Sequence, residues 1–487
     1  MGLLQVLQQG EPVNIEDETN DAPTEPLPVG SEHDPVCRSV SRQGAETAVE
    51  SAQEKTTTAQ DMLAEEEVAA RKAEIAAARA QQIENEIEEF TTLFPSICEQ
   101  YRIVGKIGEG TFSSVYKAVD IDYMRYDNSS WDQARYENGD NTQHEEELLD
   151  SNGLKRKFSS VEKEKYVAIK RIYVTSSPER IANEISILHE LSGSDSVVPL
   201  VTAVRHRDQV VVVLPYFRHD DFKTFYNKCT LVDIKYYFRS LFTALKHVHA
   251  INIIHRDIKP SNFLYDFKAR KGILVDFGLA HKQDQPDSPH PHAESSRALR
   301  DSQKINRDNR ARLTEKAPQE HGIVFEEGQV GYIKSDPRPA IKASRAGTRG
   351  FRAPEVLFRV VKQTTAIDIW AAGVILLCFL SGRFPFFCSM DDVQAILELA
   401  CIYGIDEMAA CAAIYDRTFE TNVPSLKHQR NSFRKLCLRL NPEGMKAFKE
   451  EDERLTLEAL DLLNKCMELD CTKRYTAEEA LAHPFLS

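Results

Sequence analysis

The 487-residue sequence lacks the features that mark several large classes of protein. Its longest apolar stretch, around residues 371–380, falls well short of the roughly 18 apolar residues that a membrane-spanning helix needs. The first basic residue is Arg38, so the charged start of a signal peptide and the arginine-rich pattern of a transit peptide are both missing. Gly2 follows Met1, but Val6 stands where a myristoylation signal needs serine or threonine. We therefore expect no membrane partner.

Paired cysteines and an excess of positive charge are also missing. The ten cysteines include no C-x-x-C pair, and the closest two are Cys466 and Cys471. This spacing favours a reduced, intracellular protein without a zinc or disulfide framework. The formal net charge of −14 gives no reason to expect direct contact with nucleic acid. With 42% hydrophobic and 28% charged residues, the composition is that of a soluble globular protein.

The first hundred residues change composition once. Residues 1–58 are rich in Glu, Asp, Thr, Pro and Gly, which predicts a disordered acidic region. Residues 59–92 are rich in Ala, Glu, Arg and Ile without Gly or Pro, which predicts a helix with Ile83, Ile87 and Phe90 on one face. A self-associating coiled coil and a single helix both fit this pattern, although the heptad pattern is not sustained for three repeats.

Globular sequence begins near Tyr101. Short β-rich runs and one helical stretch at 178–191 come first, and from residue 231 onward apolar residues recur at helical spacing. The expected strands are 101–107, 114–120, 166–173, 197–204 and 209–215, and the later helices are 236–249, 368–380, 393–401 and 457–469. We predict an α+β fold with a small β-rich lobe (101–215) followed by a larger α-helical lobe (216–487).

Two polar segments interrupt this order, at about 121–162 and 282–342. Both are long, charged and dotted with Pro, Asn, Asp and Ser, which is typical of inserted loops rather than domains.

Three features of the first lobe suggest nucleotide binding, and each is weak when taken alone. The run Gly108–Val115 (GEGTFSSV) joins two strands, and its glycines would let the backbone point N–H groups at a polyphosphate; the same residues also suit a plain hairpin turn. Lys170 ends the strand VAIK and would ordinarily be a solvated residue at the sheet's rim. Glu184 in the next helix could pair with Lys170, although most such pairs are surface pairs worth under ~1 kcal/mol.

The second lobe gives a more specific sequence signal, because several short motifs follow one another there in a fixed order. They are 255–262 (HRDIKPSN), 276–278 (DFG), 353–355 (APE), 368–370 (DIW) and Arg474 before the last helix. This series resembles the signature of the protein kinases. The resemblance implies a bilobal protein kinase fold that uses ATP and Mg²⁺.

The resemblance also implies a role for each motif residue. Asp257 would orient the substrate hydroxyl and accept its proton, and Lys259 would stabilise the γ-phosphate, as in kinases that act on serine and threonine. Asn262 and Asp276 would offer oxygen ligands to Mg²⁺. The ATP-binding residues would be Ile107, Gly108, Glu109, Gly110, Val115, Lys170 and Glu184.

Other motif residues are expected to act as scaffold. His255 and Phe277 should be core residues, and Glu355 should form a buried pair with Arg474. Asp368 should cap backbone amides beneath the catalytic loop.

Three strings carry a closer resemblance: 108–116 (GEGTFSSVY), 255–265 (HRDIKPSNFLY) and 345–357 (RAGTRGFRAPEVL). Together they are similar to the cell-division-cycle-seven kinases, the catalytic subunits that fire replication origins after binding a regulatory activation subunit. Ser113, in place of a third glycine, and Phe351, in place of Tyr, fit that family; Arg349 departs from it. The resemblance implies a nuclear enzyme that phosphorylates acidic, serine-rich tails of the MCM replicative helicase. It also implies inserts that help to dock the regulatory subunit, the third being short and within about 404–455.

Arg345 and Arg352 flank Thr348 in the segment expected to face the residue after the target hydroxyl. Their guanidinium groups would favour Asp, Glu or phosphoserine there through charge-assisted bonds, unless they only pair with a structural acid. We further expect the activation segment to be ordered by the bound partner rather than chiefly by phosphorylation. Residues 155–157 (KRK) suit a nuclear import signal, although three basic residues more often form a solvated loop.

Two alternatives remain open from the sequence. One is another acidophilic serine/threonine kinase, similar to the casein kinases. The other is a pseudokinase scaffold, which the joint presence of Lys170, Glu184, Asp257, Asn262 and Asp276 disfavours.

Overall fold

The computed structural model describes residues 71–128, 131, 164–283 and 343–487, apart from 72, 76 and 111. The chain divides into two compact units, with residues 10–95 in one unit and residues 96–487 in the other. In the first unit, residues 77–93 form an unbroken helix. The predicted disordered region 1–58, the start of the predicted helix and most of the two predicted inserts lie outside the described residues. Self-association of the helix stays a prediction.

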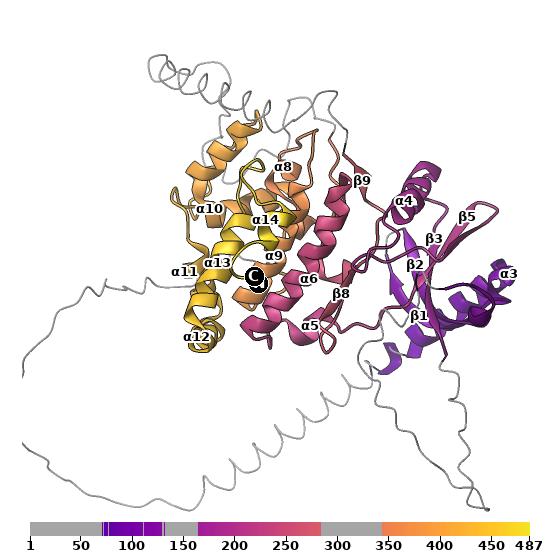
Figure 1. Ribbon diagram of the computed structural model, residues 1–487. Helices are drawn as coiled ribbons and strands as arrows, with labels where there is room; N and C mark the ends of the chain where they lie inside the picture. The colour runs from indigo at the N-terminus through magenta and orange to yellow at the C-terminus, as the bar shows by residue number, and fades with distance from the viewer. Residues whose placement is uncertain are drawn as a thin grey trace, which may run out of the picture. The chain divides into compact units, whose positions relative to one another are not determined.

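The small lobe is built on a five-stranded antiparallel sheet with the strand order β1-β2-β3-β5-β4 (Figure 1). The strands are β1 (Tyr101–Glu109), β2 (Ser113–Asp120), β3 (Tyr166–Ile172), β4 (Thr202–His206) and β5 (Gln209–Pro215). Valine and isoleucine dominate β3 and β5, and these β-branched residues favour the extended backbone. A single long helix, α4 (Pro178–Glu190), follows β3; Ser177 caps its first turn by accepting from Arg180 N.

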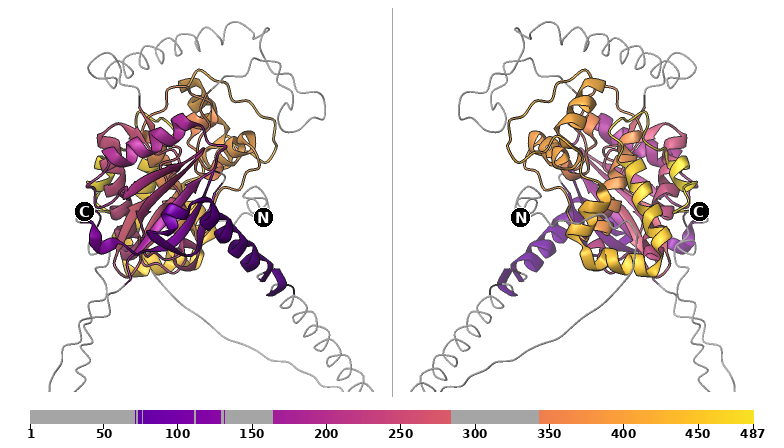
Figure 2. Two further views of the ribbon diagram at one scale, coloured as in Figure 1. Left: turned by 90° about the vertical axis from the view of Figure 1, so that its right-hand side faces the viewer. Right: turned by 90° about the vertical axis from the view of Figure 1, so that its left-hand side faces the viewer.

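The large lobe is mainly helical (Figure 1 and Figure 2). Its longer helices are α6 (Leu231–Ala250), α9 (Ala366–Ser381), α10 (Asp392–Ile414), α11 (Phe433–Leu440), α12 (Pro442–Glu451) and α13 (Glu453–Cys466), and the short ones include α5 (Phe222–Phe225), α8 (Pro354–Leu357) and α14 (Ala477–Leu481). Short strands β6 (Ile253–Ile254), β7 (Phe263–Asp266), β8 (Lys271–Leu274) and β9 (His281–Lys282) lie between α6 and α8 in the sequence. The α+β bilobal prediction is confirmed.

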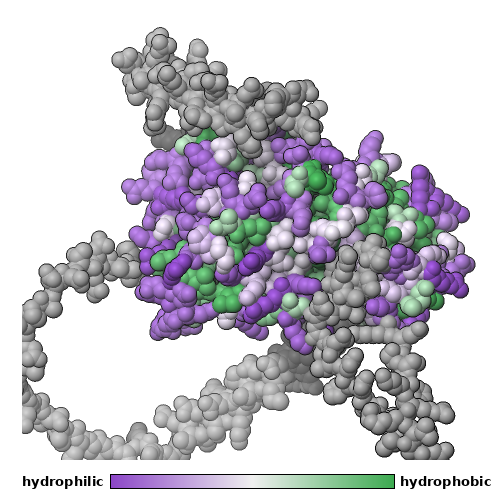
Figure 3. Space-filling model, in the orientation of Figure 1, coloured by the Kyte–Doolittle hydropathy of each residue, from purple (hydrophilic) through white to green (hydrophobic). Residues whose placement is uncertain are grey.

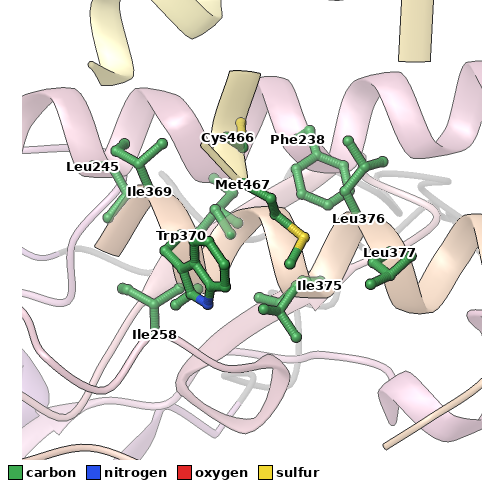
Figure 4. Close-up of a cluster of buried hydrophobic side chains, with 14 of the residues drawn as sticks. Phe238, Leu245, Ile258, Ile369, Trp370, Ile375, Leu376, Leu377, Cys466 and Met467 are labelled. Atoms are coloured by element: carbon green, nitrogen blue, oxygen red, sulfur yellow. The ribbon is translucent and has the colours of Figure 1, made fainter. Parts of the chain in front are cut away.

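The core of the large lobe surrounds α9, in which nearly every residue is buried. Figure 4 shows Trp370 of α9 beside Met467, which follows α13 directly. A Cβ at Gly373 would come within 2.7 Å of the Met467 side chain, so only glycine allows this close approach. The rigid packing of α9 matters for function because this helix also carries Asp368.

Two elements differ from the sequence-based expectation. The predicted strand 197–204 is wrong in its first half, because β4 begins only at Thr202 and Val197 makes a single bridge to Leu274. Val197 and Val198 are buried in the core, and their apolar run therefore reports burial rather than strand pairing. Helix α10 is longer than predicted and is broken at Gly404, whose φ of 80° suits glycine.

The surface is mixed in character. Hydrophilic residues cover most of the visible face in Figure 3, and apolar residues form scattered groups between them. Among the described residues, no helix combines the length and apolar character needed to cross a membrane.

Candidate active site

Three charged side chains from different parts of the chain meet beside strand β3 of the small-lobe sheet. Lys170 of β3 donates from Nζ to Glu184 Oε1 of α4 at 2.6 Å and to Asp276 Oδ1 at 2.8 Å. The Lys170 and Glu184 side chains are 9% and 6% exposed, whereas that of Asp276, just after β8, is 46% exposed. The predicted Lys170–Glu184 pair is therefore present and buried, and Asp276 joins it on the solvent side.

The electrostatics keep Lys170 and Asp276 charged at neutral pH. Burial by itself lowers the pKa of Lys170, but the carboxylates of Glu184 and Asp276 outweigh burial and raise the pKa above its ordinary value. Burial likewise raises the pKa of Asp276, but the Lys170 ammonium outweighs it and lowers the pKa to about 2. A fixed ammonium group beside a fixed carboxylate suits the binding of a phosphate and its cation.

The loop between β6 and β7 carries the predicted catalytic residues, and Asp368 holds it from below. Asp368 accepts from the backbone N of His255 at 2.8 Å and of Arg256 at 2.9 Å. His249 of α6 contacts the same carboxylate at 3.0 Å. The predicted capping role of Asp368 is confirmed. Through these bonds the packed helix α9 holds the backbone of the loop in position.

Asp257 sits at the centre of a hydrogen-bond network. Its Oδ1 accepts from Thr348 N at 2.8 Å and from Thr348 Oγ1 at 2.7 Å. Its Oδ2 accepts from Lys259 Nζ at 2.7 Å and from Asn262 Nδ2 at 3.0 Å. Burial by itself raises the pKa of Asp257, but the bonds from Lys259 and Thr348 outweigh it and hold the pKa below its ordinary value. The carboxylate is ionised and fixed in direction, as an orienting base must be.

Oxygen ligands for a divalent cation are present in the same region. Asn262 Nδ2 donates to Asp257 O at 2.9 Å as well as to its carboxylate, so the amide oxygen Oδ1 points away from Asp257. Asp276, at a φ of 64°, keeps a half-exposed carboxylate. One carboxylate and one amide oxygen are hard ligands that fit a divalent cation bound together with phosphate oxygens.

The predicted nucleotide-binding hairpin joins β1 to β2. Gly110 N donates to Ser113 O at 2.8 Å, which closes the turn. Gly108 pairs with Val115, and Val115 pairs in turn with Lys170. Paired residues share one face of a sheet, so Val115 lies on the face from which Lys170 reaches Asp276. Two further predicted residues, Ile107 and Glu109, are exposed, and Glu109 forms an ion pair with Lys106 at 3.1 Å.

The two arginines predicted to recognise the substrate, together with Arg349, converge on one acid at the start of α10. Arg352 contacts Asp392 at 2.7 Å, Arg345 at 3.3 Å and Arg349 at 3.9 Å. We call this group the three-arginine cluster. Its members differ in exposure, from 16% for Arg352 to 42% for Arg349 and 55% for Arg345. Three positive charges thus share one carboxylate.

The scaffold residues occupy the predicted places. Arg474 binds Glu355 through two nitrogens at 2.7 and 3.0 Å, and both side chains are buried. The rings of His255 and Phe277 are fully buried and contact each other edge to face at 4.8 Å.

Sequence reasoning missed several contacts of the site. Thr348 was assigned to the substrate, but it binds Asp257 and also accepts from Lys259 Nζ at 3.0 Å. Asp392 lay outside every motif, and no local signal connects it to arginines some forty positions earlier. Arg180 of α4, which donates to Gly278 O, was not singled out either, although its position four residues before Glu184 places both on one helix face.

Comparison with known proteins agrees with this geometry. The protein kinase domain matches residues 151–298 and 328–486. The chain is 48% identical over 412 residues to the cell cycle serine/threonine-protein kinase hsk1 of Schizosaccharomyces pombe, an alignment that covers 82% of this chain and 75% of that protein. It is 42% identical to the cell cycle protein kinase spo4 of the same yeast, covering 82% and 89%. It is 36% identical to the probable cell division control protein 7 homolog 1 of Encephalitozoon cuniculi, covering 83% and 95%.

Proposed function

Because the chain belongs to the cell division cycle 7 family of serine/threonine protein kinases, we propose that it phosphorylates serine or threonine residues followed by an acidic or phosphorylated residue. Its reaction is the transfer of the γ-phosphoryl group of ATP to a protein hydroxyl. We assign Mg²⁺ as the divalent cation, since one carboxylate, one amide oxygen and the phosphates complete the kind of site that Mg²⁺ prefers.

Each residue of the site has a defined part in the proposed mechanism. Asp257 accepts a hydrogen bond from the substrate hydroxyl, aims it in line with the transferred phosphorus and takes its proton. Lys259, already bonded to Asp257 at 2.7 Å, offsets negative charge that develops on the phosphoryl oxygens. Lys170, held by Glu184, binds phosphate oxygens of the nucleotide. Asp276 and Asn262 would hold the cation, which would supply positive charge to offset that of the phosphates.

The three-arginine cluster is the observation that supports the acidic preference. It lies on the same segment as Thr348, which is hydrogen-bonded to Asp257, so this segment brings the cluster toward the carboxylate that orients the substrate hydroxyl. Asp392 stands at the N-terminus of α10, and that helix end adds a positive dipole to the surplus positive charge. The neighbouring acid Asp391 caps the same helix, accepting from Gln394 N at 2.8 Å.

A pair of peptides tests the acidic preference. The two differ only in the residue after the target serine, which is aspartate in one and alanine in the other. We expect the aspartate peptide to have a kcat/KM at least tenfold higher, about 1.4 kcal/mol, because charge-assisted bonds to the arginines form only with it. A phosphoserine at that position should be turned over at least as well. Equal kcat/KM for all three peptides would remove the proposal.

The finer biological assignment is also a proposal. The names of the relatives describe cell cycle and cell division control kinases. From the family resemblance we further propose activation by a regulatory subunit and action on the MCM helicase in the nucleus, at the start of DNA replication. Residues 155–157 (KRK) would provide nuclear import.

Co-purification from cells, followed by a kinase assay, tests this assignment. We expect an isolated chain of low activity that a co-purified subunit activates, with MCM proteins among its targets. Full activity of the pure monomer would contradict the dependence on a subunit. Replacing Asp276 by Ala should abolish phosphate transfer in either state, and residual transfer by that variant would contradict the proposed mechanism.

A further inference from the structure

One face of α4 carries three polar side chains toward the site. Arg180, Asn183 and Glu184 stand at positions i, i+3 and i+4 and therefore share a face of the helix. Glu184 pairs with Lys170, as described above. The other two side chains have no part in the proposed reaction, yet both reach the segment that follows Asp276.

Arg180 and Asn183 bind the backbone of this segment at two points. Arg180 Nε donates to Gly278 O at 2.5 Å, and Asn183 Nδ2 donates to Ala280 O at 2.9 Å. The junction is tight, because a Cβ at Gly278 would lie 3.2 Å from Glu184 Oε2 and 3.6 Å from Arg180 Nη2. The position of α4 and the path of the backbone after Asp276 are therefore set together.

Arg180 also supports the nucleotide-binding hairpin. Its guanidinium carbon lies 4.1 Å from the centre of the Phe112 ring, a distance typical of a cation–π contact. Phe112 stands at the tip of the turn between β1 and β2, and its carbonyl accepts from Tyr173 N at 2.9 Å. The Phe112 ring is 39% exposed, so the guanidinium is a specific support for a ring that is otherwise only partly covered.

We propose that Arg180 is a positioning residue that couples three parts of the kinase site: the tip of the nucleotide-binding hairpin, the inward position of α4, and the backbone that orients Asp276. The edge of the guanidinium holds Gly278 while its face supports Phe112. Lowering the hairpin over the nucleotide therefore favours the arrangement in which Lys170 meets Glu184 and Asp276. The proposal rests on the kinase activity of the family and not on the identity of substrate or partner.

A double-mutant cycle on the full chain tests this coupling. The variants are Arg180→Gln, Phe112→Leu and the two combined, and calorimetry measures the Kd for Mg²⁺·ATP without any protein substrate. Glutamine keeps an amide donor for Gly278 O but has no cationic face. We expect each single change to raise the Kd about fivefold to tenfold, and the double variant to be no weaker than the worse single variant.

Asn183→Ala is the matched control, because Asn183 lies on the same helix face and binds the backbone of the same segment, at Ala280 O. When Asn183→Ala is combined with Phe112→Leu, the increase in Kd should equal the product of the two single increases, because the two residues are not coupled. In a kinase assay with a peptide substrate, Arg180→Gln should raise the KM for ATP by a larger factor than it lowers kcat.

Several results would overturn the proposal. One is a double variant whose Kd rises by the product of the two single effects; another is Arg180→Gln with a Kd within twofold of the unmodified chain. A third is a melting temperature of the nucleotide-free Arg180→Gln chain that falls by more than about 5 °C, or a failure of that variant to fold, since Arg180 would then be a structural residue. This test measures the Kd for Mg²⁺·ATP without a protein substrate. It therefore stays valid even if the proposed acidic preference or regulatory subunit is wrong.

Discussion

A single buried arginine and the three-arginine cluster, both in the large lobe, bind carboxylates in opposite ways. Arg474 and Glu355 pair one to one through two nitrogens, and their side chains are 0% and 3% exposed. In the three-arginine cluster, three guanidinium groups share one carboxylate, and two of them face solvent. A buried pair with matched charge leaves nothing for a ligand to bind. A half-exposed cluster with surplus positive charge can still bind an acidic ligand. We therefore assign the Arg474–Glu355 pair to the scaffold and the three-arginine cluster to substrate recognition.

The buried pair has the largest expected effect on stability. Replacing Glu355 by Ala leaves the Arg474 guanidinium buried without its counter-charge, which typically costs about 3–5 kcal/mol of unfolding free energy. Urea unfolding of the purified chain measures the loss. The matched control is Arg454→Ala, which breaks the pair between Arg454 and Glu458 by removing a side chain that is 85% exposed, and should cost under about 1 kcal/mol. Equal losses in the two variants would contradict the distinction drawn above.

The exposed arginines of the cluster should affect kcat/KM rather than the unfolding free energy. Replacing Arg345 and Arg349 together by Ala should leave the unfolding free energy within about 0.5 kcal/mol, since both side chains are about half exposed. For the peptide with aspartate after the target serine, kcat/KM should fall about tenfold or more, while the alanine peptide changes little. Arg454→Ala serves as the control arginine. A parallel loss for both peptides would assign the cluster to the scaffold.

Asp392 tests whether the cluster has surplus charge. In Asp392→Asn the competing carboxylate is gone, while Arg352 remains bound to Gly347 O at 3.0 Å. We expect the KM for the aspartate peptide to fall about threefold at low salt and the difference to shrink at 0.5 M salt, because exposed charges are screened. An increase in this KM would instead show that Asp392 is needed to hold the arginines in place.

The Lys170–Asp276 pair lies between the buried pair and the exposed cluster in solvent exposure, and its contribution to stability should depend on pH. The folded-state pKa of Asp276, about 2, is below the ordinary 3.8, so its contribution to stability is complete above the ordinary pKa and is lost as pH falls toward 2. The difference in unfolding free energy between the unmodified chain and Asp276→Asn should therefore shrink from about pH 5 downward. A difference that stays constant with pH would contradict the lowered pKa.

Motif order was enough to predict the fold class and the residues that meet at the site. The kinase chemistry requires Lys170, Asp257 and Asp276 to be charged and close, and the structure brings them to the same region through β3, the loop after β6 and the end of β8. The pairing of Glu355 with Arg474 was also expected. Residues 197–201 were predicted wrongly because a short apolar run indicates burial without indicating what it packs against.

The sequence by itself determined which groups do the chemistry, because reactive side chains must be of a fixed type and the backbone motifs around them are local. Only the tertiary structure decided which acid the substrate arginines share, that Thr348 lies on Asp257, and that Arg180 joins α4 to Gly278. These contacts join residues dozens of positions apart. No local pattern encodes them, since their distances depend on how whole helices and strands pack.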